Sequence, residues 1–141
     1  MENKKFTMAL YSGSLDKLTA AGVILSGAAA DDMDVDIYVL MMGARAFKKE
    51  VGADLSKLEM AEYPALKNDF INAADKLNVK SWVDFFKEAK ELTNVKIHIC
   101  GLAGKIWDGA KLDDFIDLAD DIVGINEYIT SAQDADVHLL I

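Results

Sequence analysis

Short apolar runs alternate with helical patterns along this chain, and the alternation restricts its fold more than any other feature. Runs typical of buried strands occupy residues 6–11, 34–42, 95–99, 121–123 and 137–141. Helical segments separate them, and strands joined by such crossovers pair in parallel. Right-handed crossovers place helices on both faces of the sheet. The sequence therefore predicts an α/β fold in one domain, residues 1–141. We expect a three-layer α/β/α sandwich with a parallel sheet of about five strands.

The helices are expected where apolar residues recur at helical spacing or a start signal occurs. These segments are residues 15–30, 44–50, 64–77, 81–92, 111–119 and 125–132. Ser14 is a suitable N-cap for the first, and Ser81 followed by Asp84 is a start signal for the fourth. Residues 51–63 show no clear pattern. Residues 101–110 contain three glycines and are expected to form a loop.

Composition excludes several classes of protein. The chain has 141 residues, 15 Lys plus Arg and 24 Asp plus Glu, so its net charge is −9. This balance argues against nucleic-acid and anionic-membrane partners, which need clustered basic residues. A hydrophobic content of 52% excludes a disordered chain. The one apolar helix candidate, residues 18–30, is shorter than the ~18 residues that can span a bilayer. Because a single cysteine suits a reducing compartment, we expect a cytoplasmic protein.

Three glycine-containing segments leave strands at the carboxyl edge of the predicted sheet, where ligands of open α/β proteins bind. The candidate ligand-binding residues in them are Ser12, Gly13, Ser14, Gly43 and Gly101. Their glycines would let the backbone approach a ligand closely. Neither a dinucleotide fingerprint nor a P-loop is present. The commoner interpretation of Ser12-Gly13-Ser14 is an ordinary turn from a strand into a helix.

Cys100 is the sharpest chemical feature, because it ends a strand at this edge. Thiolate is the reactive form of cysteine, and nearby cations and backbone N–H groups stabilise it. Arg45 and Lys105 are the candidate cations, with Lys17 as a third. The competing interpretation is a buried cysteine that acts as a small hydrophobic residue. A lone cysteine excludes an internal pair of redox thiols.

The remaining polar residues give weaker signals. His98 lies two residues before Cys100, so both side chains face the same side of the strand; it either tunes the thiol or is structural. Trp107 follows Cys100 in the expected loop and is a candidate cover for the site or a partner contact. Five aspartates are interpreted as a solvated face: Asp113, Asp114, Asp117, Asp120 and Asp121. No ligand spacing supports a metal site, and we expect neither a metal nor a cofactor.

Three stretches resemble the DsrE/DsrF-like sulfur-relay family. Residues 11–49 (YSGSLDKLTAAGVILSGAAADDMDVDIYVLMMGARAFKK) are similar to its first half, residues 79–100 to its helix-strand-cysteine unit, and residues 125–141 to its closing helix and strand. The matching positions in the first stretch are Tyr11, Ser12, Gly13, Asp16, Lys17, Gly27, Ala28 and Ala30. After the cysteine this chain has Gly101-Leu102-Ala103, where the most similar branch often has x-Met-Ser/Thr.

The resemblance implies a DsrE-like α/β/α fold and a cytoplasmic sulfur carrier or sulfurtransferase. Cys100 would carry a persulfide, take its sulfur from a donor protein and pass it to a thiol of an acceptor protein. Arg45 or Lys105 would stabilise the thiolate. The alternative is a non-catalytic module of the same fold, in which the turn at residues 12–14 holds the phosphate of a nucleotide, flavin or coenzyme A.

Self-association is also expected. The closing run at residues 137–141 is a short apolar edge strand, and such edges need cover. Residues 42–65 add apolar side chains that follow no regular pattern. Exposed apolar patches usually mark interfaces. We therefore expect a homo-oligomer, and the family resemblance favours a trimer or hexamer over a dimer. The alternative is a monomer in which residues 51–63 fold back over the sheet.

Overall fold

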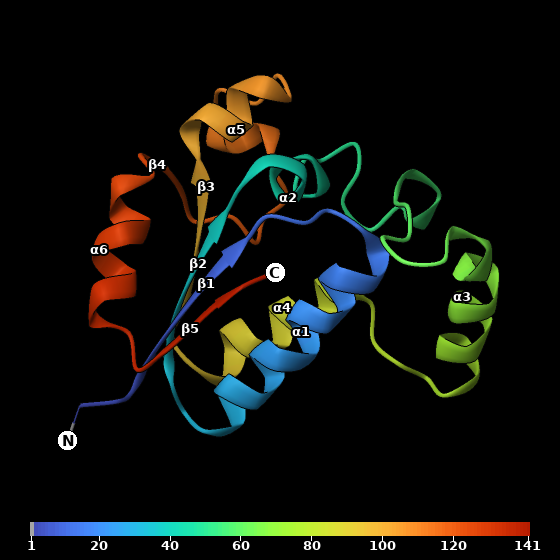
Figure 1. The fold of residues 1–141 in the computed structure, drawn as a ribbon, viewed down its shortest axis with the longest axis horizontal. Helices are drawn as coiled ribbons and strands as arrows, with labels where there is room; N and C mark the ends of the chain where they lie inside the picture. Colours follow the sequence, from blue (N-terminus) through green and yellow to red (C-terminus); the bar gives the residue numbers. More distant parts are fainter. Residues whose placement is uncertain (1) are drawn as a thin grey trace.

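A parallel five-stranded sheet forms the centre of the computed structural model, which describes residues 2–141 (Figure 1). The strands are β1 (Lys5–Leu10), β2 (Asp34–Val39), β3 (Val95–Cys100), β4 (Asp121–Val123) and β5 (Val137–Leu140). Their spatial order is β4-β3-β2-β1-β5, and every neighbouring pair is parallel. The predicted α/β fold with a parallel sheet of about five strands is confirmed.

Helices cover both faces of this sheet. Helices α1 (Leu15–Ala30) and α4 (Trp82–Leu92) pack side by side on one face, and α6 (Asn126–Asp134) lies over the other (Figure 1). Ser81 caps α4 as predicted, since its hydroxyl accepts a hydrogen bond from the Asp84 N–H group. Val35, Ile37, Ile97 and Ile99 point to the α1–α4 face and are buried. Phe47, Trp82 and Phe86 form an aromatic cluster there, with ring centroids 5.2–6.0 Å apart.

Two short helices lie at the carboxyl edge, α2 (Met41–Ala46) and α5 (Gly101–Ile106) (Figure 1). Both differ from what the sequence predicts for these residues. Strand β2 ends at Val39, and the apolar residues after it begin α2, which packs against α5. The expected loop at residues 101–110 begins with α5, because its glycines serve close packing: a Cβ on Gly104 would lie 2.6 Å from the Gly109 carbonyl oxygen.

The prediction of a helix at residues 111–119 is wrong. Only a 3-10 turn, η3 (Leu112–Asp114), forms there, and the chain then runs irregularly to β4. Phe115 pairs with Lys48 in an antiparallel bridge, and the Ile116 N–H group donates to the Phe47 carbonyl oxygen. The apolar side chains that suggested a helix belong to this irregular segment, and Phe115, Leu118 and Ala119 are buried there.

The segment between α2 and α4 extends away from the sheet (Figure 1). It contains the 3-10 turns η1 (Leu55–Lys57) and η2 (Pro64–Leu66) and helix α3 (Lys67–Lys76). The helix expected at residues 64–77 is present, but its apolar side chains are at most half-buried, with Phe70 and Ile71 packed against the core. Within residues 2–141 we find no helix with the length and apolar character needed to span a bilayer.

Candidate functional site at the carboxyl end of strand β3

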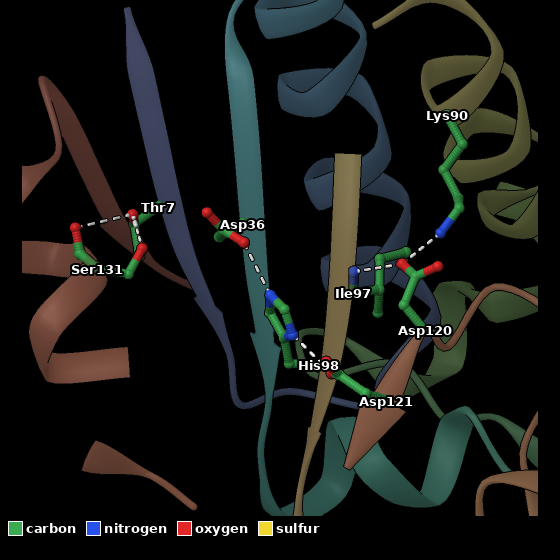
Figure 2. Close-up of polar contacts among 8 residues, drawn as sticks. All are labelled: Thr7, Asp36, Lys90, Ile97, His98, Asp120, Asp121 and Ser131. Carbon is green, nitrogen blue, oxygen red and sulfur yellow. Dashed lines mark hydrogen bonds and ion pairs between the residues drawn. The ribbon is translucent and has the colours of Figure 1, made fainter. Parts of the chain in front are cut away.

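The sheet face under α6 is polar, unlike the α1–α4 face. Side chains alternate along a strand, so this face receives Asp36 and Tyr38 from β2, His98 and Cys100 from β3, and Asp121 from β4. Helix α6 holds this face with polar contacts rather than with buried apolar residues. The Ser131 hydroxyl of α6 lies 2.7 Å from the Thr7 hydroxyl (Figure 2). The candidate site lies where this polar face meets the carboxyl edge.

Cys100 lies at the place that the sequence predicts for it. It is the last residue of β3 and the N-cap residue of α5. Its side chain is buried, with 6% of the residue exposed. Its register partner on β4 is Val123. A Cβ added to Gly101 would lie 3.5 Å from the Val123 carbonyl oxygen, so β4 also follows the first turn of α5 closely. Strand β4 therefore lies directly beside the cysteine in the sheet.

The cations proposed for Cys100 lie elsewhere. The Arg45 guanidinium donates to the Lys57 carbonyl oxygen at 3.1 Å, in a pocket that Cys100 does not line. Lys105 is exposed in the last turn of α5. It lies five positions after Cys100, which corresponds to about 7.5 Å along a helix axis. Within residues 2–141, no hydrogen bond joins either side chain to the Cys100 sulfur.

The carboxyl end of α5 is held by Lys48, which sequence reasoning missed. Its buried ammonium donates to the carbonyl oxygens of Trp107 and Asp108 at 2.9 and 3.0 Å. The Trp107 indole N–H group donates to the Met41 carbonyl oxygen at 2.8 Å. Trp107 was a candidate cover for the site, but its indole joins α5 to α2. The signal for Lys48 was weak, because a lysine before two further charged residues is typical of a surface.

His98 is the most strongly bound polar residue of this face. Its Nδ1 atom lies 2.6 Å from Asp121 Oδ1, and its Nε2 atom lies 2.7 Å from Asp36 Oδ1 (Figure 2). The Tyr38 ring stacks on it with centroids 4.6 Å apart. Burial lowers the pKa of His98, but the hydrogen bonds to Asp36 and Asp121 raise it more, so the pKa lies above its ordinary value. The two carboxylates therefore stabilise the charged form of the ring.

Two residues of the predicted aspartate face are structural. Asp121 binds His98, and the Asp120 carboxylate accepts hydrogen bonds from the Ile97 N–H group and the Lys90 ammonium (Figure 2). Asp121 remains exposed to solvent as predicted while it binds His98, whereas Asp120 is half-buried. Asp36 was also missed. The sequence feature that could have revealed it is a carboxylate inside the strand sequence DVDIYV, at a position that points toward a covering helix.

A cavity of about 450 Å³ lies between α6 and the amino-terminal half of the sheet. Its lining carries four carboxylates, Asp34, Asp36, Glu127 and Asp134, against the single ammonium of Lys5. Within the part of the chain that the structure describes, no three His, Cys, Asp or Glu side chains are arranged to hold a metal ion.

A smaller pocket brings together four of the predicted residues. Ser12, Gly13, Ser14 and Arg45 line a volume of about 170 Å³ together with Tyr11, Met42 and Glu59. The Leu15 N–H group at the start of α1 already donates to the Glu59 carbonyl oxygen. A Cβ on Gly13 would lie 2.1 Å from the Met42 carbonyl oxygen, and one on Gly43 would lie 2.4 Å from the Leu10 carbonyl oxygen. These glycines allow close backbone packing between β1, α1 and α2, and neither Gly43 nor Gly101 lines this pocket.

The fold and site define an α/β protein with a five-stranded parallel sheet and a buried cysteine at its carboxyl edge. No family model matches the chain. It is 28% identical to the uncharacterized protein YrkE of Bacillus subtilis (strain 168) over 163 aligned positions. The alignment covers 99% of this chain and 98% of YrkE, so the similarity extends over the whole of both proteins.

Proposed function

We propose that the protein is a sulfur carrier, with Cys100 as the residue that holds the sulfur. The observation that carries the proposal is the place of this cysteine, at the carboxyl end of a central parallel strand and largely covered by protein. The chain contains no second thiol with which it could form an internal disulfide. The resemblance to the DsrE/DsrF-like family supports the same role, since the equivalent cysteine carries a persulfide in its sulfur-transferring members.

The proposed reaction consists of two thiol–persulfide exchanges. The Cys100 thiolate attacks the outer sulfur of a donor protein's persulfide, an S–S bond forms to Cys100, and the donor's S–S bond breaks. The donor leaves as a thiolate. An acceptor thiolate then attacks the outer sulfur of the Cys100 persulfide, and Cys100 leaves as the thiolate. Each step breaks and forms one S–S bond, so the overall transfer needs no external oxidant or reductant.

Burial suits a carrier, because a covered persulfide is protected from oxidants and from unrelated thiols. Neither Arg45 nor Lys105 forms a hydrogen bond with the sulfur, so we propose that they act on partners instead. Both are cations at the carboxyl edge, where they would attract an anionic donor or acceptor. Substituting Lys105 with Gln should therefore slow association with a partner and leave the persulfide on Cys100 stable.

Mass spectrometry tests the proposal directly. The protein is incubated anaerobically with inorganic polysulfide and digested without reductant. We expect an adduct of one sulfur atom on the Cys100 peptide, its release by a small thiol, and no adduct in Cys100→Ser. An unmodified Cys100 peptide under conditions that convert a control persulfide-forming protein would overturn the proposal.

A second candidate function is small-molecule binding at the turn of residues 12–14. The pocket there supports it, because it places Arg45 beside Ser12 and Ser14. Its volume of about 170 Å³ is smaller than a typical ligand pocket of roughly 300–1,000 Å³. The acidic residue Glu59 also lines it, which disfavours a phosphate. We therefore place this candidate behind sulfur transfer. Absorbance at 260 nm or a flavin spectrum after denaturation of the purified protein would favour this candidate.

We further propose that the protein forms a homo-oligomer, a trimer or a hexamer. Support comes from surfaces that the monomer leaves uncovered. Tyr63 and Leu77, on either side of α3, are 72% and 76% exposed, and Leu140 on edge strand β5 is 69% exposed. Light scattering decides the matter, since a mass near 15.4 kDa at micromolar concentration would contradict any oligomer.

A further inference from the structure

One imidazole ring connects three neighbouring strands on the polar face of the sheet. His98 on β3 contacts Asp36 on β2 through Nε2 and Asp121 on β4 through Nδ1, at 2.7 and 2.6 Å. A neutral imidazole offers one N–H donor and one lone pair, so it donates to only one of these carboxylates. Both contacts are hydrogen bonds only when the ring is protonated, and charge-assisted bonds have such short distances.

The charged and titratable groups that surround the ring come from β2, β3, β4 and α6. Asp36 and Tyr38 face it from β2, Asp121 from β4, and Lys96 and Cys100 flank it on β3; Glu127 and Tyr128 approach Tyr38 from α6. Burial raises the pKa of Tyr38, so its hydroxyl stays neutral while His98 titrates. The pKa of His98 is itself raised, so its proton leaves above the ordinary histidine range of about 6.5.

Loss of that proton would act on β4 rather than on β2. Strand β2 pairs with a neighbour on each side along its length. Strand β4 is an edge strand, and three residues pair it to β3: Asp121 with His98, Ile122 with Ile99, and Val123 with Cys100. In the neutral ring that keeps its proton on Nε2, the lone pair on Nδ1 would face the Asp121 carboxylate, and the two would repel each other. The short edge strand is the element that can move away.

The movement would be confined to the residues beside the thiol. Asp120 binds the Ile97 N–H group and the Lys90 ammonium, contacts that do not involve His98 (Figure 2). Its own N–H group donates to the Ile97 carbonyl oxygen at 2.8 Å. Asp120 therefore stays attached to β3 while residues 121–124 are freed, and Gly124 ends this short segment. Val123, the register partner of Cys100, lies within it.

We propose that His98 is a proton-operated latch on Cys100: the protonated ring holds residues 121–124 against β3 and covers the thiol, and the neutral ring releases them and exposes it. His98 is thus a positioning residue that acts through Asp121 and β4. The meaning of this latch for sulfur transfer rests on the proposed function, but the latch itself does not, because its movement can be measured without the thiol.

Hydrogen exchange in the full-length Cys100→Ser protein tests the latch. Exchange rates are followed from pH 6 to pH 9 and corrected for the intrinsic pH dependence of amide exchange. We expect the protection of residues 121–124 to fall by about tenfold or more over this range, while β1 and β2 stay protected. Protection of these amides that does not change with pH would overturn the proposal.

Two further substitutions keep the test specific. Asn at position 121 donates to a neutral imidazole through its amide, so Asp121→Asn should make protection of residues 121–124 independent of pH. His138, the chain's other histidine, also lies on the α6 face but contacts Tyr128, and His138→Gln should behave as the unsubstituted chain does. A pH dependence retained in Asp121→Asn, or lost in His138→Gln, would also overturn the latch.

Alkylation of Cys100 by iodoacetamide relates the latch to the site. In the chain with its native Cys100, the rate should rise with pH more steeply than that of a small thiol, and Asp121→Asn should remove the excess. A latch that operates in a protein that forms no persulfide would refute sulfur transfer and leave the latch intact. If Cys100 forms a persulfide but its alkylation rate rises equally steeply with pH in the native chain and in Asp121→Asn, the latch alone would be refuted.

Discussion

Gly22 of α1 lies directly against Phe85 of α4, and a Cβ at Gly22 would come within 2.7 Å of the Phe85 Cβ atom. The two helices that cover one face of the sheet therefore approach each other at a position where only glycine fits. Gly27, five residues later on the same helix, has open space around it, since nothing lies within 4 Å of its added Cβ.

The same substitution at these two glycines should have opposite effects. Gly27→Ala should raise the free energy of unfolding by about 0.5–1 kcal/mol, because alanine is the better helix former. Gly22→Ala should lower it by about 1 kcal/mol or more, because overpacking against Phe85 exceeds that gain. Urea unfolding of both variants measures the difference. Equal stabilisation by both would contradict the close approach of α1 and α4.

Lys48 and Lys49 are adjacent in sequence and differ in their environment. Lys48→Met removes the buried ammonium that holds the end of α5 and leaves the carbonyl oxygens of Trp107 and Asp108 without that donor. We expect a loss of about 2 kcal/mol in unfolding free energy, as for other hydrogen bonds to charged groups. Lys49 forms an exposed ion pair with Asp113, so Lys49→Met should change stability by less than about 0.5 kcal/mol. Similar losses in the two variants would count against the anchoring role of Lys48.

The His98 ion pairs should make stability depend on pH with a definite sign. The pKa of His98 is raised in the folded chain, so its contribution is complete below the unfolded pKa of about 6.5. It is lost as pH rises through the higher folded pKa. The stability difference between the unsubstituted chain and His98→Gln should therefore be about 2 kcal/mol near pH 6 and shrink toward pH 9. Denaturation curves at several pH values check this, and a difference that grows with pH has the wrong sign.

Asp16 should control the segment that packs over the start of α1. Its carboxylate accepts hydrogen bonds from the Ala61 and Glu62 N–H groups at 2.9 and 3.1 Å. Burial raises the pKa of Asp16, but these bonds and one from Ser14 lower it more, so the pKa lies below its ordinary value. The stabilisation is thus present above the unfolded pKa of about 3.9 and is lost as pH falls through the folded pKa.

Asp16→Ala should accordingly free this segment at neutral pH. Hydrogen exchange at pH 7 should show loss of protection at Ala61 and Glu62 and unchanged protection in β1. Asp31→Ala, at the other end of the same helix, is the control. Unchanged protection of Ala61 and Glu62 in Asp16→Ala would show that other contacts hold the segment.

Local patterns predicted most of the elements because local physics forms them. The apolar run before Ser12 and the period-two run ending at Cys100 both became central strands. The start signal at Ser81 became an N-cap with its hydrogen bond to Asp84. The pattern failed at residues 111–119, where apolar residues at helical spacing are buried although the segment is irregular. It also failed at residues 101–106, where glycines that suggested a loop permit tight packing of a helix.

The sequence alone determined the parallel α/β architecture and the place of Cys100 at the carboxyl edge, because periodicity and turn residues act over a few neighbouring positions. The tertiary structure decided which side chains surround that edge. His98 meets Asp121 and Asp36, which are 23 and 62 residues away along the chain. Those contacts depend on the strand order β4-β3-β2, which no local pattern encodes. Arg45 likewise came to line a pocket with Ser12 and Ser14, since the close approach of Gly43 to the Leu10 carbonyl oxygen brings α2 against the end of β1.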